Sequence, residues 1–216
     1  MTKEILFSAI ASSVIAYLLG SLSFAVIISR CFYKKDIRKF GSGNAGMTNI
    51  LRTFGKKAAA FTLIGDMGKG VAAVLIAKMI FLYFADSVPV YGAYLAAFFA
   101  TLGHLYPVYF KFKGGKGVAV AAGTVLATEP MVFVALAAVF LIMIALTKIV
   151  SLSSIAVATL YPVFTFLYSY FFVPERSAVL CTVFSALLGA LIIWMHHENI
   201  KRLANGTEYK FGQKKQ

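Results

Sequence analysis

The stretch ILFSAIASSVIAYLLGSLSFAVIIS, residues 5–29, decides the fold class of this chain. It contains no charged side chain and is long enough for one helix to cross the roughly 30 Å hydrocarbon layer of a membrane. The apolar core of a secretory signal peptide is shorter, at about 7 to 15 residues, and follows a positively charged segment. Only Lys3 and Glu4 precede this run near the N-terminus. We therefore predict a retained membrane span.

The composition of the whole chain points the same way. Hydrophobic residues make up 60% of the 216 positions and charged residues only 13%, whereas soluble domains carry about 25% charged residues. The net charge of +13 would also suit a nucleic-acid partner, but basic residues of membrane proteins collect on the cytosolic side and face anionic lipid. We expect membrane lipids and no nucleic acid as partners. Cys31 and Cys181 lack metal-ligand spacing, so we expect no disulfide, metal or cofactor.

Successive apolar runs predict an all-α integral membrane protein with seven transmembrane helices in a single domain, residues 1–216. We place the helices at about residues 5–29, 58–83, 89–110, 117–128, 130–147, 150–172 and 177–195. The fourth is short, because a dozen residues rising 1.5 Å each reach only roughly 17 Å. Pro130 prevents it from continuing smoothly into the fifth helix.

The basic residues set the orientation. With seven spans, most of the 21 Lys and Arg residues fall on one side, and the other side keeps only Lys3 and Arg176. Merging the fourth and fifth helices would move Lys148 and the basic C-terminal tail to that other side. Because basic loops stay in the cytosol, we predict an outer N-terminus and a cytosolic C-terminus.

Three polar segments would then face the cytosol. The first is GSGNAGMTNILRTFG, residues 41–55. Its glycines let the backbone turn sharply and approach a ligand, Thr48 or Asn49 can cap a short helix, and Arg52 can hold a phosphate with two hydrogen bonds. A flexible, solvated loop is the alternative. The residues that we assign to phosphate binding are Gly41, Ser42, Gly43, Asn44, Thr48, Asn49 and Arg52.

The second segment is GHLYPVYFKFKGGKG, residues 103–117, which leads into the short fourth helix. The N–H groups of Gly114 and Gly115, the helix dipole and Lys116 would all address one anion there. The segment is not a nucleotide-binding P-loop, because Gly117 stands where a Ser or Thr would hold magnesium. We assign Lys111 and Lys113 to anchoring at the membrane interface.

The third segment is MHHENIKRLANGTEYKFG, residues 195–212. On a continuing helix, His196 and Asn199 share a face that Arg202 extends, so they could donate to a substrate hydroxyl or phosphoryl oxygen. The alternative for His196 is a polar cap on a membrane helix, and we leave His104 and His197 without a functional role.

Two charged residues lie well inside the second predicted helix. Asp66 and Lys69 are three positions apart, and an unpaired charge inside a membrane is costly. We expect them to pair or to face the interior of the bundle, either as a structural ion pair or as a wall of the polar site. Lys78, nearer the outer end, is expected to extend toward the interface.

The three segments, in this order and spacing, resemble the signature segments of the bacterial acyl-phosphate:glycerol-3-phosphate acyltransferases. The matching residues are GSGNAGMTN with Arg52, GHLYPVYFKFKGGKG, and HHENIKRL followed by GTEYK. The resemblance implies transfer of a fatty acyl group from acyl phosphate to the sn-1 hydroxyl of glycerol 3-phosphate, giving lysophosphatidic acid. It also implies the bacterial cytoplasmic (inner) membrane, with the active site facing the cytosol. We expect a functional monomer.

The resemblance also implies roles for individual residues. Ser42 and Arg52 would grip phosphate, Lys116 would neutralise the leaving phosphate, and His196 and Asn199 would orient glycerol 3-phosphate. Two positions depart from the family pattern, since His197 stands where we expect Arg and Val120 where we expect a small or hydroxyl residue.

Two other functions remain open. A basic, glycine-rich cavity would also suit a membrane carrier for a phosphorylated solute, although nearly all candidate groups lie at one face and the sequence has no internal repeat. A structural or lipid-binding scaffold is the second alternative, and it leaves the density of the three segments unexplained.

Overall fold

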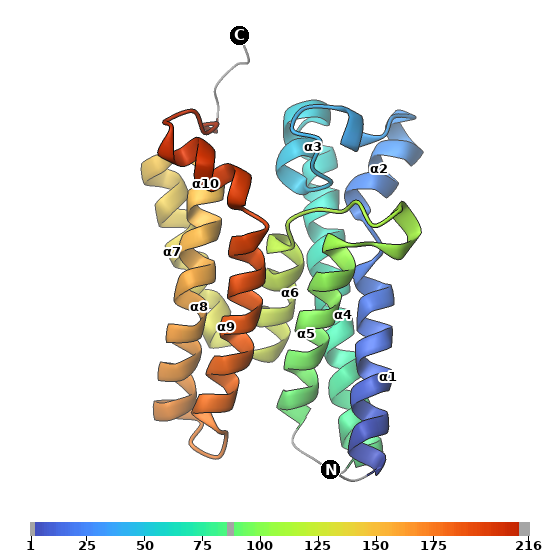
Figure 1. Cartoon of the computed structure of the whole chain (residues 1–216), viewed down its shortest axis with the longest axis vertical. Coiled ribbons are helices and arrows are strands. Elements are labelled where there is room, and N and C mark those ends of the chain that lie inside the picture. The colour runs from blue at the N-terminus through green and yellow to red at the C-terminus, as the bar shows by residue number, and fades with distance from the viewer. Residues whose placement is uncertain (1–2, 86–88, 212–216) are drawn as a thin grey trace. The chain divides into compact units, whose positions relative to one another are not determined.

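The computed structural model describes residues 3–85 and 89–211 (Figure 1). Within those ranges the chain forms α-helices and two short 3-10 helices, and no strand. The all-α prediction is therefore confirmed. The chain forms two compact units, Met1–Thr128 and Glu129–Gln216. The first unit contains α1 (Lys3–Gly20), α2 (Phe24–Tyr33), α3 (Met47–Phe54), α4 (Lys56–Ala85), α5 (Pro89–Leu105) and α6 (Val118–Thr128). The second contains α7 (Pro130–Thr147), α8 (Val150–Phe172), α9 (Ala178–Trp194) and α10 (His197–Ala204).

Several of these helices are suited to a membrane. Four segments of the described chain are long and apolar enough to cross one: Lys3–Tyr33, Lys56–Ala85, Pro130–Thr147 and Val150–Phe172. The pair α9 and α10, bent by 61°, would be a fifth. The apolar helix α6 is shorter and coincides with the short fourth helix predicted for residues 117–128.

In the first unit, α1, α4, α5 and α6 pack side by side (Figure 1). Glycines allow this close packing. A side chain at Gly20 of α1 would overlap the carbonyl of Ala100 in α5, and one at Gly123 of α6 would overlap the carbonyl of Met67 in α4. Small residues at helix crossings let backbones approach in this way, which is how membrane helices gain packing energy where lipid offers no hydrophobic drive.

The first predicted span is broken. We predicted one helix over residues 5–29, but α1 ends at Gly20 and α2 begins at Phe24. Groups at the break form hydrogen bonds with neighbouring elements. The Leu22 carbonyl accepts a hydrogen bond of 2.6 Å from Lys69 Nζ, and Ser21 Oγ accepts one of 3.4 Å from the Val108 amide. The prediction of one continuous helix was wrong because these partners lie far along the chain, although Lys3–Tyr33 as a whole is long and apolar enough to be a span.

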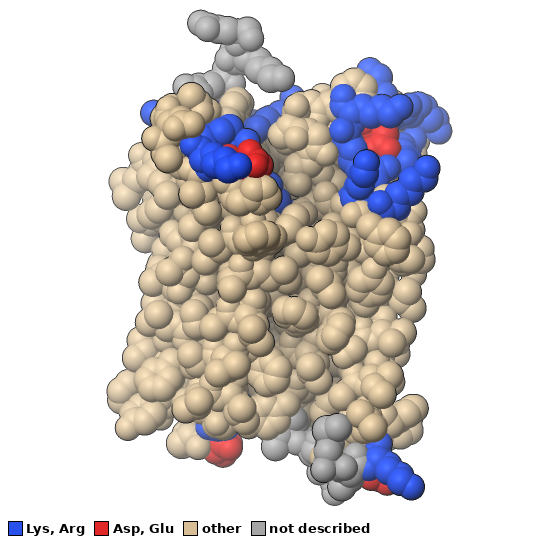
Figure 2. Space-filling view, viewed as in Figure 1, with Lys and Arg blue, Asp and Glu red and all other residues tan. Residues whose placement is uncertain are grey.

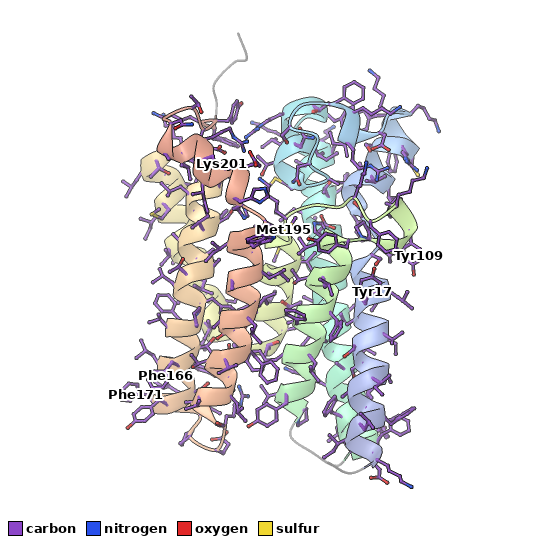
Figure 3. The ribbon with its side chains drawn as sticks, viewed as in Figure 1. Tyr17, Tyr109, Phe166, Phe171, Met195 and Lys201 are labelled. Carbon is purple, nitrogen blue, oxygen red and sulfur yellow. The ribbon has the colours of Figure 1, made fainter. Side chains whose placement is uncertain are left out.

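The third predicted helix, residues 89–110, also ends early. Helix α5 stops at Leu105, and the chain continues through a short 3-10 helix, η2 (Val108–Phe110). Pro107 lies between them, and proline has no N–H with which to continue a helix. The loop that follows is held at the C-terminal end of α1 by the Tyr17 hydroxyl, which donates to the Tyr106 carbonyl at 2.8 Å, and Figure 3 shows Tyr109 close to Tyr17.

In the second unit, α7 packs on α8 and α8 on α9. Pro130 is at the first position of α7, directly after the cap residue Glu129, so the predicted separation of α6 from α7 is confirmed. The buried Glu129 carboxylate accepts a hydrogen bond of 2.9 Å from Thr165 Oγ1 on α8, which ties the start of α7 to its neighbour.

Candidate functional site

The first polar segment is preceded by a cluster of charged side chains. Asp36 Oδ2 accepts hydrogen bonds of 2.8 Å from both Arg30 and Arg38. Arg38 and Arg30 hold the pKa of the Asp36 carboxyl well below its usual range despite its partial burial, so this carboxylate stays charged. Arg38 Nη1 also donates to the carbonyls of Phe110 at 2.7 Å and Lys113 at 3.2 Å. Arg38 therefore links the first polar segment to the second.

The Asn49 side chain organises the first segment. It is buried, its Nδ2 donates to the carbonyls of Phe40 at 2.9 Å and Asn44 at 3.0 Å, and its Oδ1 accepts from the Ser42 amide at 3.1 Å. Gly41 adopts a φ of +60° beside it, where a side chain would overlap Asn49 Oδ1. These contacts fold the loop around the side-chain amide of Asn49.

The prediction that Thr48 or Asn49 caps the short helix is wrong. Helix α3 begins at Met47, its cap residue is Gly46, and no side chain bonds the free amides of its first turn. Asn49 lies inside the helix and turns its amide back to the loop. Arg52 lies one turn further along α3 and is exposed, and Thr48 is half-buried.

The second segment differs from its predicted geometry in one respect. The amides of Gly114 and Gly115, expected to face a phosphate, donate to the carbonyls of Leu105 at 3.1 Å and His104 at 3.2 Å. They secure the loop to the end of α5, so the expectation that these two amides bind phosphate is wrong. Lys116, half-buried, comes next and directly precedes Gly117, whose φ of +85° turns the chain into α6.

The first two segments meet. The Ala45 amide donates to the Gly114 carbonyl at 3.4 Å, and a side chain on Gly115 would approach the Ala45 carbonyl oxygen to 2.6 Å. Together with the Arg38 bonds, these contacts bring residues 38–46 and 110–115 of the first unit into one structure. Lys and Arg atoms gather over α2 and the loop that leads to α3 (Figure 2). This end of the unit is thus a basic surface built on two interlocked loops.

A buried charged cluster lies beside these loops. The predicted pairing of Asp66 with Lys69 is confirmed, with Nζ 2.8 Å from Asp66 Oδ1. His104 joins them, its Nδ1 lying 2.9 Å from Lys69 Nζ, and all three side chains are buried. No sequence pattern pointed to His104, because only the packing of α5 against α4 brings it to Lys69. We expected Lys78 to extend toward the interface, but its Nζ instead donates to the Ala127 carbonyl at 2.6 Å.

The third segment is bent. We predicted a continuing helix, but α9 ends at Trp194 and α10 starts at His197 after a 61° change of direction. Figure 3 shows Met195 and Lys201 on either side of this bend. His196, at the bend, is buried, and its Nδ1 lies 2.7 Å from the Ile192 carbonyl oxygen. Gly212, the last residue of the segment, lies outside the described residues.

Glu208 binds several side chains in and beside the third segment, although we did not single it out from the sequence. Its carboxylate accepts hydrogen bonds from Asn199 Nδ2 at 2.8 Å, Arg202 Nε at 2.7 Å and Ser151 Oγ at 2.9 Å. Asn199 and Arg202 therefore do face the same way, as predicted, but toward a carboxylate. The available signal was an acidic residue within an otherwise basic tail.

The pKa of Glu208 has two opposing influences. Burial raises it, and the hydrogen bonds from Asn199, Arg202 and Ser151 together outweigh burial, so the pKa lies below the ordinary 4.5. A carboxyl whose pKa is lowered in the folded state stabilises that state above its ordinary pKa, and the contribution is lost as the pH falls through the lowered value. Glu208 therefore stabilises α10 at neutral pH.

We predict that Glu208→Gln weakens the anchoring of α10 at pH 7. Hydrogen bonds to a charged group are stronger than neutral ones, so amide exchange in α10, corrected for intrinsic rates, should rise by roughly tenfold. The wild-type protein should approach the variant only below about pH 4.5. Glu198→Gln is the matched control, because Glu198 is an exposed carboxylate on the same helix that pairs with Lys201. Equal exchange in the two variants would contradict this role for Glu208.

Comparisons with known proteins show which family this chain matches. The family model described as glycerol-3-phosphate acyltransferase matches residues 10–206. The chain is 44% identical to the glycerol-3-phosphate acyltransferase of Agrobacterium fabrum, covering 94% of this chain and 92% of that one, and 42% identical to that of Clostridioides difficile, covering 98% and 99%. It is similar to the crystal structure of PlsY (YgiH), an integral membrane glycerol 3-phosphate acyltransferase, in its glycerol 3-phosphate form, with a TM-score of 0.80 and 38% identity over 95% of this chain and 96% of that one. For the lysophosphatidic acid form the TM-score is 0.76 at 37% identity, with the same coverage.

Proposed function

The chain belongs to the glycerol-3-phosphate acyltransferase family, and from that premise we propose that it is an integral membrane enzyme that acylates glycerol 3-phosphate and releases lysophosphatidic acid. The observation that carries the proposal is the junction of the first two segments, where Ala45 bonds Gly114 and Arg38 bonds the carbonyls of Phe110 and Lys113. The junction supports a common basic surface for Arg52, on the helix α3 that follows the first loop, and Lys116, in the second loop. Two phosphate-bearing substrates need such a surface, because their charges repel each other.

The proposed donor is acyl phosphate, and the proposed acceptor is the sn-1 hydroxyl. The hydroxyl oxygen attacks the acyl carbonyl carbon, the bond from that carbon to the phosphate oxygen breaks, and inorganic phosphate leaves. A substrate phosphate oxygen takes the hydroxyl proton, so the protein need not supply a nucleophile. Its task is to hold the reactants together and to stabilise the charge that grows on the leaving phosphate. No metal or cofactor enters this scheme.

Within this scheme the first two segments hold the phosphates. Ser42 and Arg52 bind one phosphate, and Lys116 stabilises the leaving one, assisted by the first turn of α6 that follows it. The remaining assigned residues shape the two loops. The bonds of Asn49 with its own loop and of the Gly114 and Gly115 amides with α5 support this division. The residues that act by shaping are Gly41, Gly43, Asn44, Thr48, Asn49, Gly114 and Gly115.

The third segment orients glycerol 3-phosphate in this proposal. His196 and Asn199 would approach the acceptor, and Glu208 would hold Asn199 in place through the 2.8 Å bond to its amide. The family match supports a role for all three segments, because residues 10–206 include the first two segments and the third as far as residue 206. The two units would then act together as one acyltransferase domain, residues 1–216, in a monomer.

The proposed topology has seven spans, an outer N-terminus and a cytosolic site in the bacterial inner membrane. Each unit supports it separately. In the first, the loops that follow α2 and α5 carry seven of the 14 Lys and Arg residues, whereas α1 starts at the other end with Lys3. In the second, Lys148 lies beside the end of the described chain, since its carbonyl accepts from the Phe211 amide at 2.6 Å. Basic residues of both units would thus face the cytosol.

The proposal is tested by giving purified protein three alternatives in parallel. Labelled glycerol 3-phosphate is supplied with palmitoyl phosphate, with palmitoyl-CoA, or with no donor after reconstitution into liposomes. We expect labelled lysophosphatidic acid from palmitoyl phosphate alone. Product from palmitoyl-CoA alone would overturn the proposed donor, and label exchange across the liposome membrane without any acylated product would favour the carrier.

A further inference from the structure

The buried cluster of Asp66, Lys69 and His104 has no role in the scheme above. The exposed fractions of these residues are 1%, 5% and 3%. Charged groups inside a membrane protein are costly and mark a functional or architectural need. The cluster lies where four elements of the first unit meet: the break between α1 and α2, helix α4, the end of α5, and the loop of the second polar segment.

Lys69 occupies the centre of the cluster. Its ammonium nitrogen lies 2.6 Å from the Leu22 carbonyl oxygen, 2.8 Å from Asp66 Oδ1 and 2.9 Å from His104 Nδ1. An ammonium group has three hydrogens and accepts none, so His104 Nδ1 must be the acceptor of the bond between them. The ring hydrogen of His104 is therefore on Nε2, the nitrogen on the opposite side of the ring from Lys69.

His104 Nε2 faces the junction of the two polar loops. The position that a Gly115 side chain would occupy overlaps Nε2 and lies 2.6 Å from the Ala45 carbonyl oxygen. The His104 backbone is engaged there too, because its carbonyl accepts from the Gly115 amide at 3.2 Å. His104 thus touches the loop with its ring and its main chain, one residue before Lys116.

We infer that Lys69 and His104 are positioning residues for the loop that carries Lys116. Lys69 fixes the ring orientation and the tautomer of His104, and His104 presents Nε2–H to the segment at Gly115 and Ala45. Lys69 also holds the Leu22 carbonyl, which connects the break in the first span to the same loop. Neither residue is placed in contact with substrate, and their effect on acyl transfer rests on the function proposed above.

Two substitutions separate the two sides of the ring. In His104→Gln, the side-chain amide nitrogen can reach the position of Nε2 and retain a donor to the loops. In His104→Asn, the shorter amide oxygen can reach the position of Nδ1 and retain the acceptor for Lys69, but the donor to the loops is lost. We expect His104→Gln to keep most of the turnover and His104→Asn to lose roughly tenfold in kcat, because Asn leaves no group at the position of Nε2 beside Gly115.

Amide exchange gives a second measurement that does not depend on activity. In His104→Asn, the peptide covering residues 106–117 should exchange roughly tenfold faster than in the wild-type protein, while His104→Gln stays close to wild type. A purely structural role predicts the reverse order, because Asn preserves the buried contact with Lys69. Equal effects, or greater loss in the Gln variant, would overturn the inference. If the wild-type protein transfers no acyl group, the function proposed above fails, and the exchange data still decide this inference.

A double variant covers the case in which neither His104 variant folds. Asp66→Asn combined with Lys69→Met removes the buried charges together, which is better tolerated than removing one partner. It should also accelerate exchange in residues 106–117. Lys78→Met is the control, since Lys78 is a half-buried lysine of the same helix that donates to the Ala127 carbonyl. The control should leave exchange in residues 106–117 unchanged, and a double variant with wild-type exchange there would refute the role of Lys69.

Discussion

Replacing Lys116 by alanine should reduce kcat for acyl transfer by about 100- to 1000-fold, the range found when one stabilising donor is removed from a developing anion. The expectation follows from its position. Lys116 lies between Gly115, whose amide donates to the His104 carbonyl, and Gly117, whose φ of +85° turns the chain into α6. Its backbone is therefore held on both sides. Because the positive charge acts mainly on the leaving phosphate, kcat should fall much more than the KM for glycerol 3-phosphate rises.

The matched control is Lys113→Ala. Lys113 belongs to the same loop and is exposed, and its main chain serves the fold: the carbonyl accepts from Arg38, and the amide donates to the Phe110 carbonyl at 3.4 Å. The control should keep turnover close to wild type, because an exposed lysine at an interface adds little beyond local charge. Steady-state kinetics with palmitoyl phosphate distinguish the two. A Lys116→Ala protein with wild-type kcat, or a Lys113→Ala protein with the same loss, would contradict the assignment of Lys116.

Membrane helices were predictable from sequence to the extent that hydrophobicity alone determines them. The apolar runs gave α4, α6, α7, α8 and α9 within a few residues, since a helix that satisfies its own backbone is required in lipid. The break at residues 21–23 was missed because the groups that bond to it, Lys69 of α4 at the Leu22 carbonyl and the Val108 amide of η2 at the Ser21 hydroxyl, lie far along the chain. Long-range partners of this kind leave no periodic signal in the sequence.

The candidate site was predicted by residue type, from groups that can bind a ligand. The pattern assigned the glycines and Asn49 of the first segment and the glycines of the second to phosphate binding. Their hydrogen bonds run to their own loops and to α5, which a ligand-based reading of the pattern did not anticipate. Glu208 and His104 were missed for a shared reason. Each acquires its partners only after folding, Glu208 from α8 and α10 and His104 from α4.

Gly115→Ala should reduce acyl transfer by about 100-fold, the loss expected when a catalytic group is displaced by about 1 Å. Gly115 is not among the described residues with positive φ, so its backbone conformation would tolerate alanine. Space is what excludes the side chain. A Cβ there would overlap His104 Nε2 and approach the Ala45 carbonyl oxygen to 2.6 Å, well inside van der Waals contact. His104 is buried and bonded to Lys69, so it has no room to retreat, and the loop with Lys116 must move instead.

Gly68→Ala is the control for this substitution. Gly68 lies within α4, an added Cβ there meets nothing within 4 Å, and alanine favours a helix over glycine by up to about 1 kcal/mol. It should leave turnover unchanged and raise the melting temperature slightly. Because Gly115→Ala displaces one loop, it should lower kcat far more than the yield of folded protein. The turnover of Gly115→Ala and of Gly68→Ala is therefore compared per folded molecule. A Gly115→Ala protein with wild-type turnover would mean that the junction of the two loops does not position Lys116.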